Sequence, residues 1–355
     1  MADSYKQQVE ELMAIVLKEG ASDIHFTAGR NPTIRVSGTL VPLVAKPVLT
    51  PQDTQGLLFA LLSEENKKLF LDKKELDFSY ASGAEARFRG NAFYQQGMVG
   101  VALRLVPQKV QTIEELNLPP VLADIARRKQ GFFLVVGPVG HGKSTTLAAM
   151  VNLINQERSE HIVTIEDPIE YVFPEARSII DQREVRFDTA DFPTALRSMF
   201  RQDVNVGMIG EMRGLDTIST AVTAAETGHL ILSTLHTNNA AQTVDRIIDS
   251  FPAEQQKQIR IQLAASLIGI FSQRLIPRVS GGRVPGYELL LNNNAVSTLI
   301  REGRTHEINV VIETGAEEGM VDMNHSLAEL VRRGEVASDV AYNYSFNPDG
   351  LQRLL

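Results

Sequence analysis

The sequence predicts an α/β protein with two domains, and three observations lead to that prediction. The chain has 355 residues, a length typical of two domains. Its first hundred residues mix helix patterns with short strand patterns joined by tight connections, which is typical of an α+β domain. Beyond them, apolar strands alternate with longer helices, which is typical of a central sheet buried on both faces.

Prolines mark the boundary between the two predicted domains. Pro107, Pro119 and Pro120 frame a stretch that cannot form one continuous helix. We therefore place the N-terminal domain at residues 1–106, a linker at 107–120 and the second domain, with a C-terminal helical segment, at 121–355.

Two helices are predicted in the N-terminal domain. Near the start of the chain, apolar side chains recur at helical spacing and Gly20 follows as a stop signal. Thr50 and Pro51 are typical of an N-cap and a first helical residue, and they open a second helix that runs to Leu62. The apolar stripe of the first helix consists of Val9, Leu12, Met13, Val16 and Leu17.

Strand patterns occur in both domains. In the N-terminal domain they cover residues 23–26, 33–36, 86–93 and 99–106, with a turn at Ser37-Gly38 after the second. In the second domain they cover residues 132–136, 162–165, 206–209 and 230–232. The second set is almost entirely apolar, so we expect it to form the buried central sheet.

Composition limits the possible function classes. The chain carries 43 acidic and 35 basic residues, a net charge of −8, whereas binding to a phosphate backbone requires excess basic charge, so we expect no nucleic-acid partner. Cysteine is absent, which excludes disulfides and thiolate metal sites. No secretory signal or membrane-length apolar run stands out, so we expect a cytoplasmic protein that reaches any membrane machine through a protein partner.

A glycine-rich segment lies between the first buried strand and a helix. Residues 137–144 read GPVGHGKS and match the phosphate-binding pattern G-x-x-x-x-G-K-[ST]. In this pattern the backbone N–H groups point at phosphate oxygens, the lysine reaches the β- and γ-phosphates, and the serine hydroxyl ligates Mg²⁺. The helix that begins at Lys143 adds its positive end. We expect the nucleotide-binding residues to be Gly137, Pro138, Val139, Gly140, His141, Gly142, Lys143, Ser144 and Thr145.

Two carboxylates follow buried strands and fit the chemistry of ATP hydrolysis. This reaction needs one carboxylate to hold the water shell of the metal and another to orient the attacking water. Glu166 and Glu211 follow strands whose carboxyl ends reach the same sheet edge as the phosphate loop. An acidic residue in a turn is also common without any function, so position alone leaves both interpretations open.

Histidines and arginines supply further candidates. His229 and His236 flank the strand at 230–232, so His236 could reach the nucleotide edge. On the two adjacent N-terminal strands lie Arg87, Arg89 and Arg104. A ring-shaped ATPase needs a cation from outside the phosphate loop, although lone histidines and exposed arginines are more often structural.

Four ordered motifs, together with an N-terminal segment, make the chain similar to the secretion-type AAA-like ATPases, and within them to the retraction ATPases of type IV pili. An N-terminal mark, ASDIH at residues 21–25, precedes the phosphate loop. TIEDPIE at 164–170 resembles the Asp box of the family, IGEMR at 209–213 its Walker B segment, and residues 227–237 its His box. The resemblance runs over nearly the whole chain.

The resemblance implies a PAS-like N-terminal domain, a RecA-like ATPase domain, and ATP with Mg²⁺ as cofactors. It implies assembly as a homo-hexamer. It makes Glu166 the water-activating carboxylate, while Ser144 ligates Mg²⁺ and Glu211 acts on it through water. His229 and His236 would sense the γ-phosphate, and Arg89 and Arg104 would reach nucleotide, with Arg87 a weaker candidate.

Within this family the resemblance favours the motor that powers pilus retraction and twitching motility. Extension and type II secretion ATPases usually carry a further N-terminal domain and a four-cysteine zinc module; this sequence contains no cysteine, and we expect neither feature here. Residues 295–304 resemble a C-terminal segment of the retraction proteins. The implied partners are an inner-membrane platform protein, through which pilin disassembles, and a paralogous retraction ATPase. The implied location is peripheral, at the inner face of the cytoplasmic membrane.

Two alternatives remain open at this point. One is a pilus extension or type II secretion ATPase. The other is an accessory nucleotide-binding paralogue with weak hydrolysis, which three departures from the family pattern favour. His141 replaces a small residue and has no expected catalytic role, Gly207 interrupts an apolar strand and should weaken it, and Gly214 replaces an aspartate.

Overall fold

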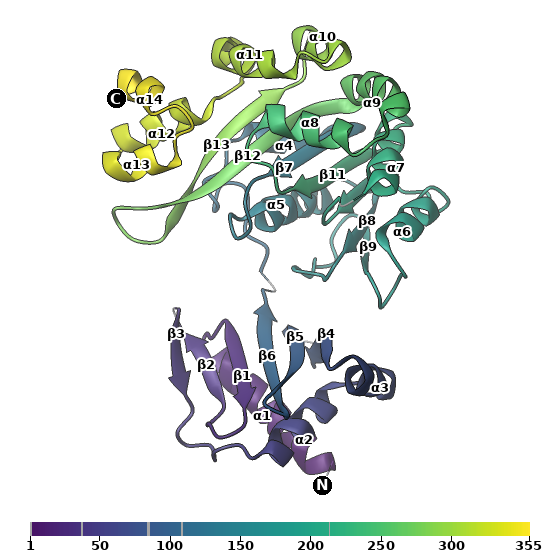
Figure 1. Ribbon diagram of the computed structural model, residues 1–355, viewed down its shortest axis with the longest axis vertical. Coiled ribbons are helices and arrows are strands. Elements are labelled where there is room, and N and C mark those ends of the chain that lie inside the picture. Colours follow the sequence, from purple (N-terminus) through teal and green to yellow (C-terminus); the bar gives the residue numbers. More distant parts are fainter. Residues whose placement is uncertain (1, 37, 84–85, 108, 213) are drawn as a thin grey trace. The chain divides into compact units, whose positions relative to one another are not determined.

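The computed structural model describes residues 2–36, 38–83, 86–107, 109–212 and 214–355 (Figure 1). It divides the chain into two compact units, Met1–Lys109 with Glu170–Val172, and Val110–Ile169 with Phe173–Leu355. Three residues used in the sequence analysis lie outside the described residues: Ser37 of the predicted turn, one position of the linker (108) and Arg213 of the Walker B-like segment.

The first unit is built on a six-stranded antiparallel sheet in the order β3-β2-β1-β6-β5-β4. Its strands are β1 (Asp23–Thr27), β2 (Thr33–Val36), β3 (Thr39–Pro42), β4 (Glu75–Ser82), β5 (Ala86–Gln95) and β6 (Met98–Val106). Its helices are α1 (Ala2–Lys18), α2 (Pro51–Leu61) and α3 (Glu64–Lys73). The two predicted helices and four predicted strands are confirmed, whereas α3, β3 and β4 were not predicted.

One face of this sheet is apolar and the other is polar. Along β5, Phe88 and Ala92 are buried in the core of the unit, and Arg89 between them is exposed on the opposite face because side chains alternate along a strand. The apolar stripe of α1 packs into the same core, except that Leu17, at its edge, is 38% exposed. Thr50 caps α2 in a full capping box with Asp53, as the sequence predicts.

The second unit contains a seven-stranded sheet in the order β13-β12-β7-β11-β10-β8-β9. Every neighbouring pair is parallel except β12 with β13, which is antiparallel. The strands are β7 (Gly131–Val136), β8 (His161–Glu166), β9 (Ile179–Glu184), β10 (Val206–Ile209), β11 (Leu230–Leu235), β12 (Leu267–Pro277) and β13 (Arg283–Leu291). The four predicted strands are β7, β8, β10 and β11, which lie side by side in the middle of the sheet.

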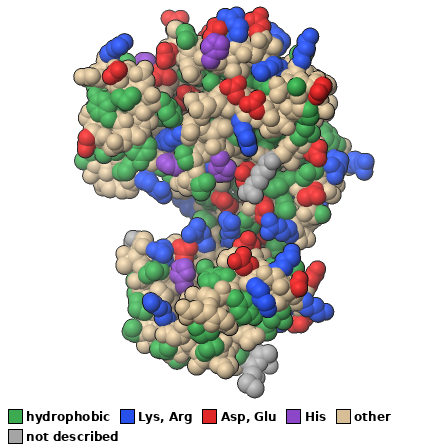
Figure 2. Space-filling view, in the orientation of Figure 1, with side chains coloured by type: hydrophobic (Ala, Val, Ile, Leu, Met, Phe, Trp, Pro, Cys, Tyr) green, Lys and Arg blue, Asp and Glu red, His purple; other side chains and the backbone are tan. Residues whose placement is uncertain are grey.

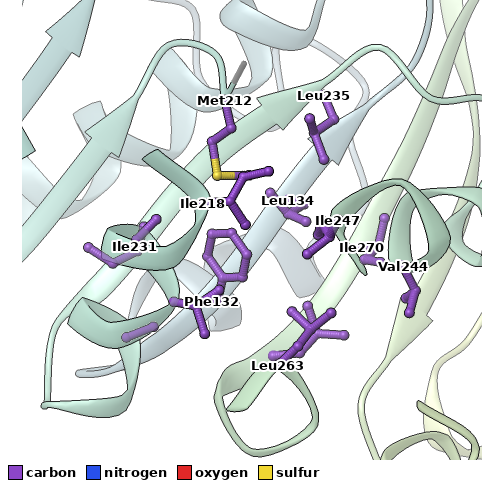
Figure 3. Packing of buried hydrophobic residues seen from close by; sticks show 14 of the residues in the cluster. Phe132, Leu134, Met212, Ile218, Ile231, Leu235, Val244, Ile247, Leu263 and Ile270 are labelled. Atoms are coloured by element: carbon purple, nitrogen blue, oxygen red, sulfur yellow. The ribbon is translucent and has the colours of Figure 1, made fainter. Parts of the chain in front are cut away.

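Helices cover both faces of this sheet (Figure 1). Phe132 and Leu134 of β7 share a core with Ile218 of α7, Val244 of α8 and Leu263 of α9 (Figure 3). The helices of the unit are α4 (Val121–Ala126), α5 (Lys143–Glu157), α6 (Phe192–Met199), α7 (Leu215–Glu226), α8 (Ala240–Asp249), α9 (Ala253–Ser266), α10 (Asn294–Glu302), α11 (Ile308–Thr314), α12 (Met323–Arg332), α13 (Ser338–Tyr344) and α14 (Pro348–Leu354). Short 3₁₀ turns lie at Thr305–Glu307 and Ala316–Glu318.

Gly207 does not interrupt its strand, contrary to the sequence expectation. It lies within β10 and pairs with Val163 on one side and Ile231 on the other. A Cβ atom at this position would lie 2.9 Å from Cδ1 of Ile231 and 3.0 Å from Sδ of Met199. The glycine therefore makes room for Met199 of α6 to pack against the sheet.

The surface carries charges of both signs. On the face shown in Figure 2, acidic and basic side chains are interspersed over each unit. Within the described part of the chain, no helix combines the length and the apolar character that crossing a membrane requires.

Replacing Gly269 by alanine should destabilise the second unit. Gly269 lies where the β12 register shifts beside β7, and a Cβ atom there would lie 2.4 Å from the carbonyl oxygen of Leu290 in β13. This oxygen belongs to the backbone, so relief requires moving a strand. We expect Gly269→Ala to lower the unfolding free energy by about 3 kcal/mol, measured by urea unfolding followed by circular dichroism.

Gly214→Ala is the matched control for this substitution. A Cβ atom at Gly214 would have no heavy atom within 4 Å. Gly214 is the N-cap of α7, where alanine is a poorer cap than glycine, so the unfolding free energy of this variant should fall by no more than about 1 kcal/mol. Equal stability of the two variants would contradict the close approach of β12 and β13.

Candidate functional site

The parallel register brings four strand ends to one edge of the sheet. Val136, the last residue of β7, pairs with Leu235 of β11, and Ile209 of β10 pairs with Ile165 of β8. The segments that follow these strands therefore start beside one another, at the edge where α/β proteins bind ligands. Four predicted site residues lie at this edge: Lys143, Glu166, Glu211 and His236.

The glycine-rich loop after β7 has the backbone shape that its sequence predicts. Gly137, Gly140 and Gly142 have φ values of 145°, 79° and 81°, a region that favours glycine. A Cβ atom at Gly140 would meet nothing within 4 Å, so the loop is open at its tip. The N-cap of α5 is Gly142, which has no side chain to cover the positive helix end.

Lys143 is buried and bonded to its own loop. Its Nζ atom donates to the carbonyl oxygens of Gly137 and Pro138, both at 2.9 Å. It also lies 3.1 Å from Nδ1 of His236. An ammonium group can only donate, so Nδ1 of His236 accepts and the imidazole proton lies on Nε2. That Nε2 atom faces Oε1 of Glu211 at 3.4 Å, and the structure thus joins three predicted site residues in one chain of contacts.

Glu166 is buried at the end of β8 and held by two donors. Thr164 Oγ1 donates to its Oε1 at 2.7 Å, and Gln182 Nε2 donates to the same oxygen at 3.3 Å. A Cβ atom on Gly210 would lie 3.4 Å from Cα of Glu166, so the end of β10 packs directly against it. The sequence analysis missed both donors. Thr164 could have been found, because residues two apart on a strand share a face.

His229 lies at the opposite edge of the sheet from the phosphate loop. Its carbonyl oxygen accepts the backbone N–H of Gly131, the first residue of β7, and its Nδ1 lies 2.9 Å from the carbonyl oxygen of Ala224. Six residues of β11 separate His229 from His236, a span of about 20 Å. His229 therefore does not fit the expected role at this chain's own phosphate loop, because the two histidines flank a whole strand.

Arg89 and Arg104 lie directly opposite each other on β5 and β6 of the first unit. Arg104 Nε donates to Oδ1 of Asp23 at 2.8 Å, and Ser22 Oγ donates to Oδ2 of the same carboxylate at 2.7 Å. Burial raises the pKa of Asp23, but these two hydrogen bonds, together with the charges of Arg104 and His25, outweigh it and hold the pKa below its usual value. Asp23 of the segment Ala-Ser-Asp-Ile-His thus holds the side chain of Arg104 in place.

A buried polar network anchors the segment that follows His236. Arg274 of β12 donates through Nη2 to the carbonyl oxygen and Oδ1 of Asn238, at 3.3 and 3.0 Å. Its guanidinium lies over the ring of Phe346 at 5.4 Å. Glu288 of β13 accepts the backbone N–H of Ala240 at 2.8 Å. The sequence analysis missed this network because β12 and β13 were not predicted.

Comparisons with known proteins show which proteins the chain is similar to. The family described as type II/IV secretion system protein matches residues 2–336. The type IV pilus retraction ATPase PilT of Pseudomonas aeruginosa is 42% identical over 333 residues, 94% of this chain and 96% of that protein. A twitching motility protein of Neisseria gonorrhoeae is 42% identical over 321 residues, 90% of this chain and 86% of that protein.

A solved structure is also similar. The crystal structure of the pilus retraction motor PilT with bound ADP matches with a TM-score of 0.91 at 45% identity, covering 97% of this chain and 98% of that one.

Glu288 should make the stability of the protein depend on pH. Burial raises its pKa to about 7, against the hydrogen bond from Ala240, so the folded state binds a proton more tightly than the unfolded state. The unfolding free energy should then fall as pH rises from about 5 to about 8. Glu288→Gln keeps the oxygen acceptor without a charge, so it should match the original protein at pH 5 and exceed it by up to about 3 kcal/mol at pH 8. Urea unfolding at both pH values measures this difference. An equal difference in unfolding free energy between the two proteins at pH 5 and pH 8 would contradict the prediction.

Proposed function

Because the chain belongs to the type II/IV secretion system protein family, we propose that it is a P-loop ATPase whose hydrolysis of ATP powers the retraction of type IV pili. One observation carries the proposal. Lys143, His236 and Glu211 form a chain of contacts at the strand edge that also holds the buried Glu166, in a protein 42% identical to a pilus retraction ATPase over 94% of its length.

The geometry supports a specific division of roles among these residues. Lys143 exchanges its bonds to the loop carbonyls for bonds to the β- and γ-phosphates, which are charged and therefore stronger acceptors. Glu166 orients and deprotonates the attacking water, and the donated bond from Thr164 fixes its direction. His236 lies between Lys143 and Glu211, where it links the γ-phosphate position to the metal position.

Ser144 and Glu211 fit the Mg²⁺ that such a reaction uses. Both offer hard oxygen atoms, the ligand type that Mg²⁺ prefers, and both follow strands that end at the loop edge. When bound, the ion neutralises charge on the phosphate oxygens. Glu211, whose Oε1 faces Nε2 of His236, would act on the ion through water, as the family resemblance implies.

The first unit supplies the remaining proposed contacts. Its antiparallel sheet, with the apolar face in the core and the other face exposed, supports the PAS-like domain that the family resemblance implies. Arg89 and Arg104 lie side by side on the exposed face, and like charges so placed favour an anionic partner. We propose that they approach a nucleotide in a homo-hexamer, with Arg87 and His229 as weaker candidates.

The proposed partners follow from retraction itself. The hexamer acts at the inner face of the cytoplasmic membrane on an inner-membrane platform protein, so that pilin leaves the fibre. A paralogous retraction ATPase is a further partner.

The alternative of a weakly hydrolysing accessory paralogue loses much of its support. Gly207 fits between Met199 and Ile231, Gly214 lies in open space, and His141 is hydrogen-bonded through Nδ1 to the backbone of Leu275. Each of the three residues thus fits its local surroundings. An extension or type II secretion motor remains the second candidate, and a cellular assay separates it from retraction.

Two substitutions test the proposed hydrolysis. Lys143→Ala removes the cation that binds the phosphates, and the release of phosphate from Mg-ATP should fall to background. Glu166→Gln removes the base but keeps the hydrogen bond from Thr164, so nucleotide binding should persist while turnover drops by about a hundredfold or more. Full activity of either purified variant would refute the assignment.

Complementation tests the direction of the motor. A strain that lacks its retraction ATPase should keep surface pili and lose twitching, and expression of this chain should restore twitching. The Glu166→Gln variant is the control, since it should fold and fail to restore. Restoration of pilus assembly in an extension-deficient strain, without restored twitching, would favour the second candidate.

A further inference from the structure

Strand β12 extends beyond β7 and continues beside the phosphate loop. Ser272 of β12 pairs with Val136, the last residue of β7. The next three residues, Gln273, Arg274 and Leu275, therefore run alongside the loop that follows Val136. The family motifs of this unit follow the central strands β7, β8, β10 and β11. Strand β12 is not one of these strands, so we consider its contacts separately.

Three hydrogen bonds join β12 to the loop and to the helix that follows. Thr146 Oγ1 in the first turn of α5 donates to Oε1 of Gln273 at 2.6 Å, and both groups are buried. Gln273 Nε2 donates to the carbonyl oxygen of His141 at 2.9 Å. The backbone N–H of Leu275 donates to Nδ1 of His141, also at 2.9 Å. We call Gln273, His141 and Thr146 the loop brace.

Two loop glycines are in close contact with the same strand. A Cβ atom on Gly137 would lie 2.4 Å from the carbonyl oxygen of Gln273, and one on Gly142 would lie 2.9 Å from its Nε2. Gly140, at the tip, would meet nothing. The loop is therefore supported by β12 at both ends and open where an anion would enter.

We propose that the loop brace holds the phosphate loop in its nucleotide-binding shape before nucleotide arrives, and that His141 must be neutral to do so. Gln273 and His141 are then positioning residues, because they act through the loop backbone. The inference rests on the proposed function of this loop in binding nucleotide. If the brace is lost, only part of the population presents the binding shape, and the apparent affinity falls by that fraction.

The protonation state of His141 follows from its partner. Leu275 donates to Nδ1, and an imidazolium has no acceptor, so the bond exists only with neutral His141. Burial, and then the nearby cations Arg274 of β12, Lys143 of α5 and Arg283 of β13, hold the pKa of His141 below its usual 6.5. The bond is therefore complete above pH 6.5 and is lost as pH falls through the lower folded-state value.

The test compares three forms of the full chain by calorimetric titration with ADP and Mg²⁺, from about pH 7.5 to about pH 5. His141→Ala removes the acceptor and should weaken ADP binding about five- to tenfold at pH 7.5. His141→Asn places an amide oxygen at the position of Nδ1, and this acceptor does not titrate. Its affinity for ADP should therefore fall less between pH 7.5 and pH 5 than the affinity of the original protein does, whatever its value at pH 7.5.

Each outcome decides the proposal. A wider gap between His141→Asn and the original protein at low pH supports the brace, whereas three identical affinities at every pH overturn it. Gln273→Leu, which removes both side-chain bonds at nearly constant volume, should weaken ADP binding at pH 7.5, and unchanged binding in this folded variant would also overturn it.

A last control separates this inference from the proposed function. Lys143→Ala should bind ADP far more weakly than any brace variant. If the original protein itself binds no ADP, the proposed function fails and the brace inference fails with it. If the original protein binds ADP and the His141 variants match it, only the brace fails.

Discussion

The register of the parallel strands is the constraint on which the site depends. Because β7, β11, β10 and β8 pair in parallel and in step, their carboxyl ends meet at one edge. No single loop could bring an ammonium, an imidazole and two carboxylates together from segments up to a hundred residues apart. The sheet does so by burying apolar side chains on both faces, so the same packing that stabilises the unit also places its reactive groups.

Contacts with neighbouring residues then orient the side chains at that edge. The hydroxyl of Thr164 fixes Glu166, and His236 links Lys143 to Glu211. Strand β12 supports the loop from the side, and a buried arginine and glutamate anchor the segment after His236. In the first unit, Asp23 plays a comparable part for Arg104. These candidate site side chains are thus each oriented by a contact with a neighbouring residue.

Much of this arrangement could be predicted from the sequence. Elements with a clear periodicity were found, such as α1, α2 and the central strands. Residues in dense motifs, such as Lys143 and Glu166, lie at the strand and helix ends where the sequence places them, and their roles stay predictions. Elements without a pattern were missed. Helix α3 buries little besides Phe70, so it shows no apolar stripe. Strand β9, at the sheet edge, consists of two isoleucines followed by four polar residues, so it shows no apolar strand pattern.

Side-chain partners were mostly beyond sequence reasoning. Gln273 and Thr146 lie 127 residues apart, and nothing in either segment points to the other. His229 and His236 belong to one motif, yet the six residues of β11 lie between them, and motif membership alone does not give that separation. Lys143 has a further consequence, because its ammonium donates to two carbonyl oxygens of its own loop, so this charge keeps hydrogen-bond partners when a product departs. These partners favour the release of product, which an enzyme must complete before it can bind the next substrate.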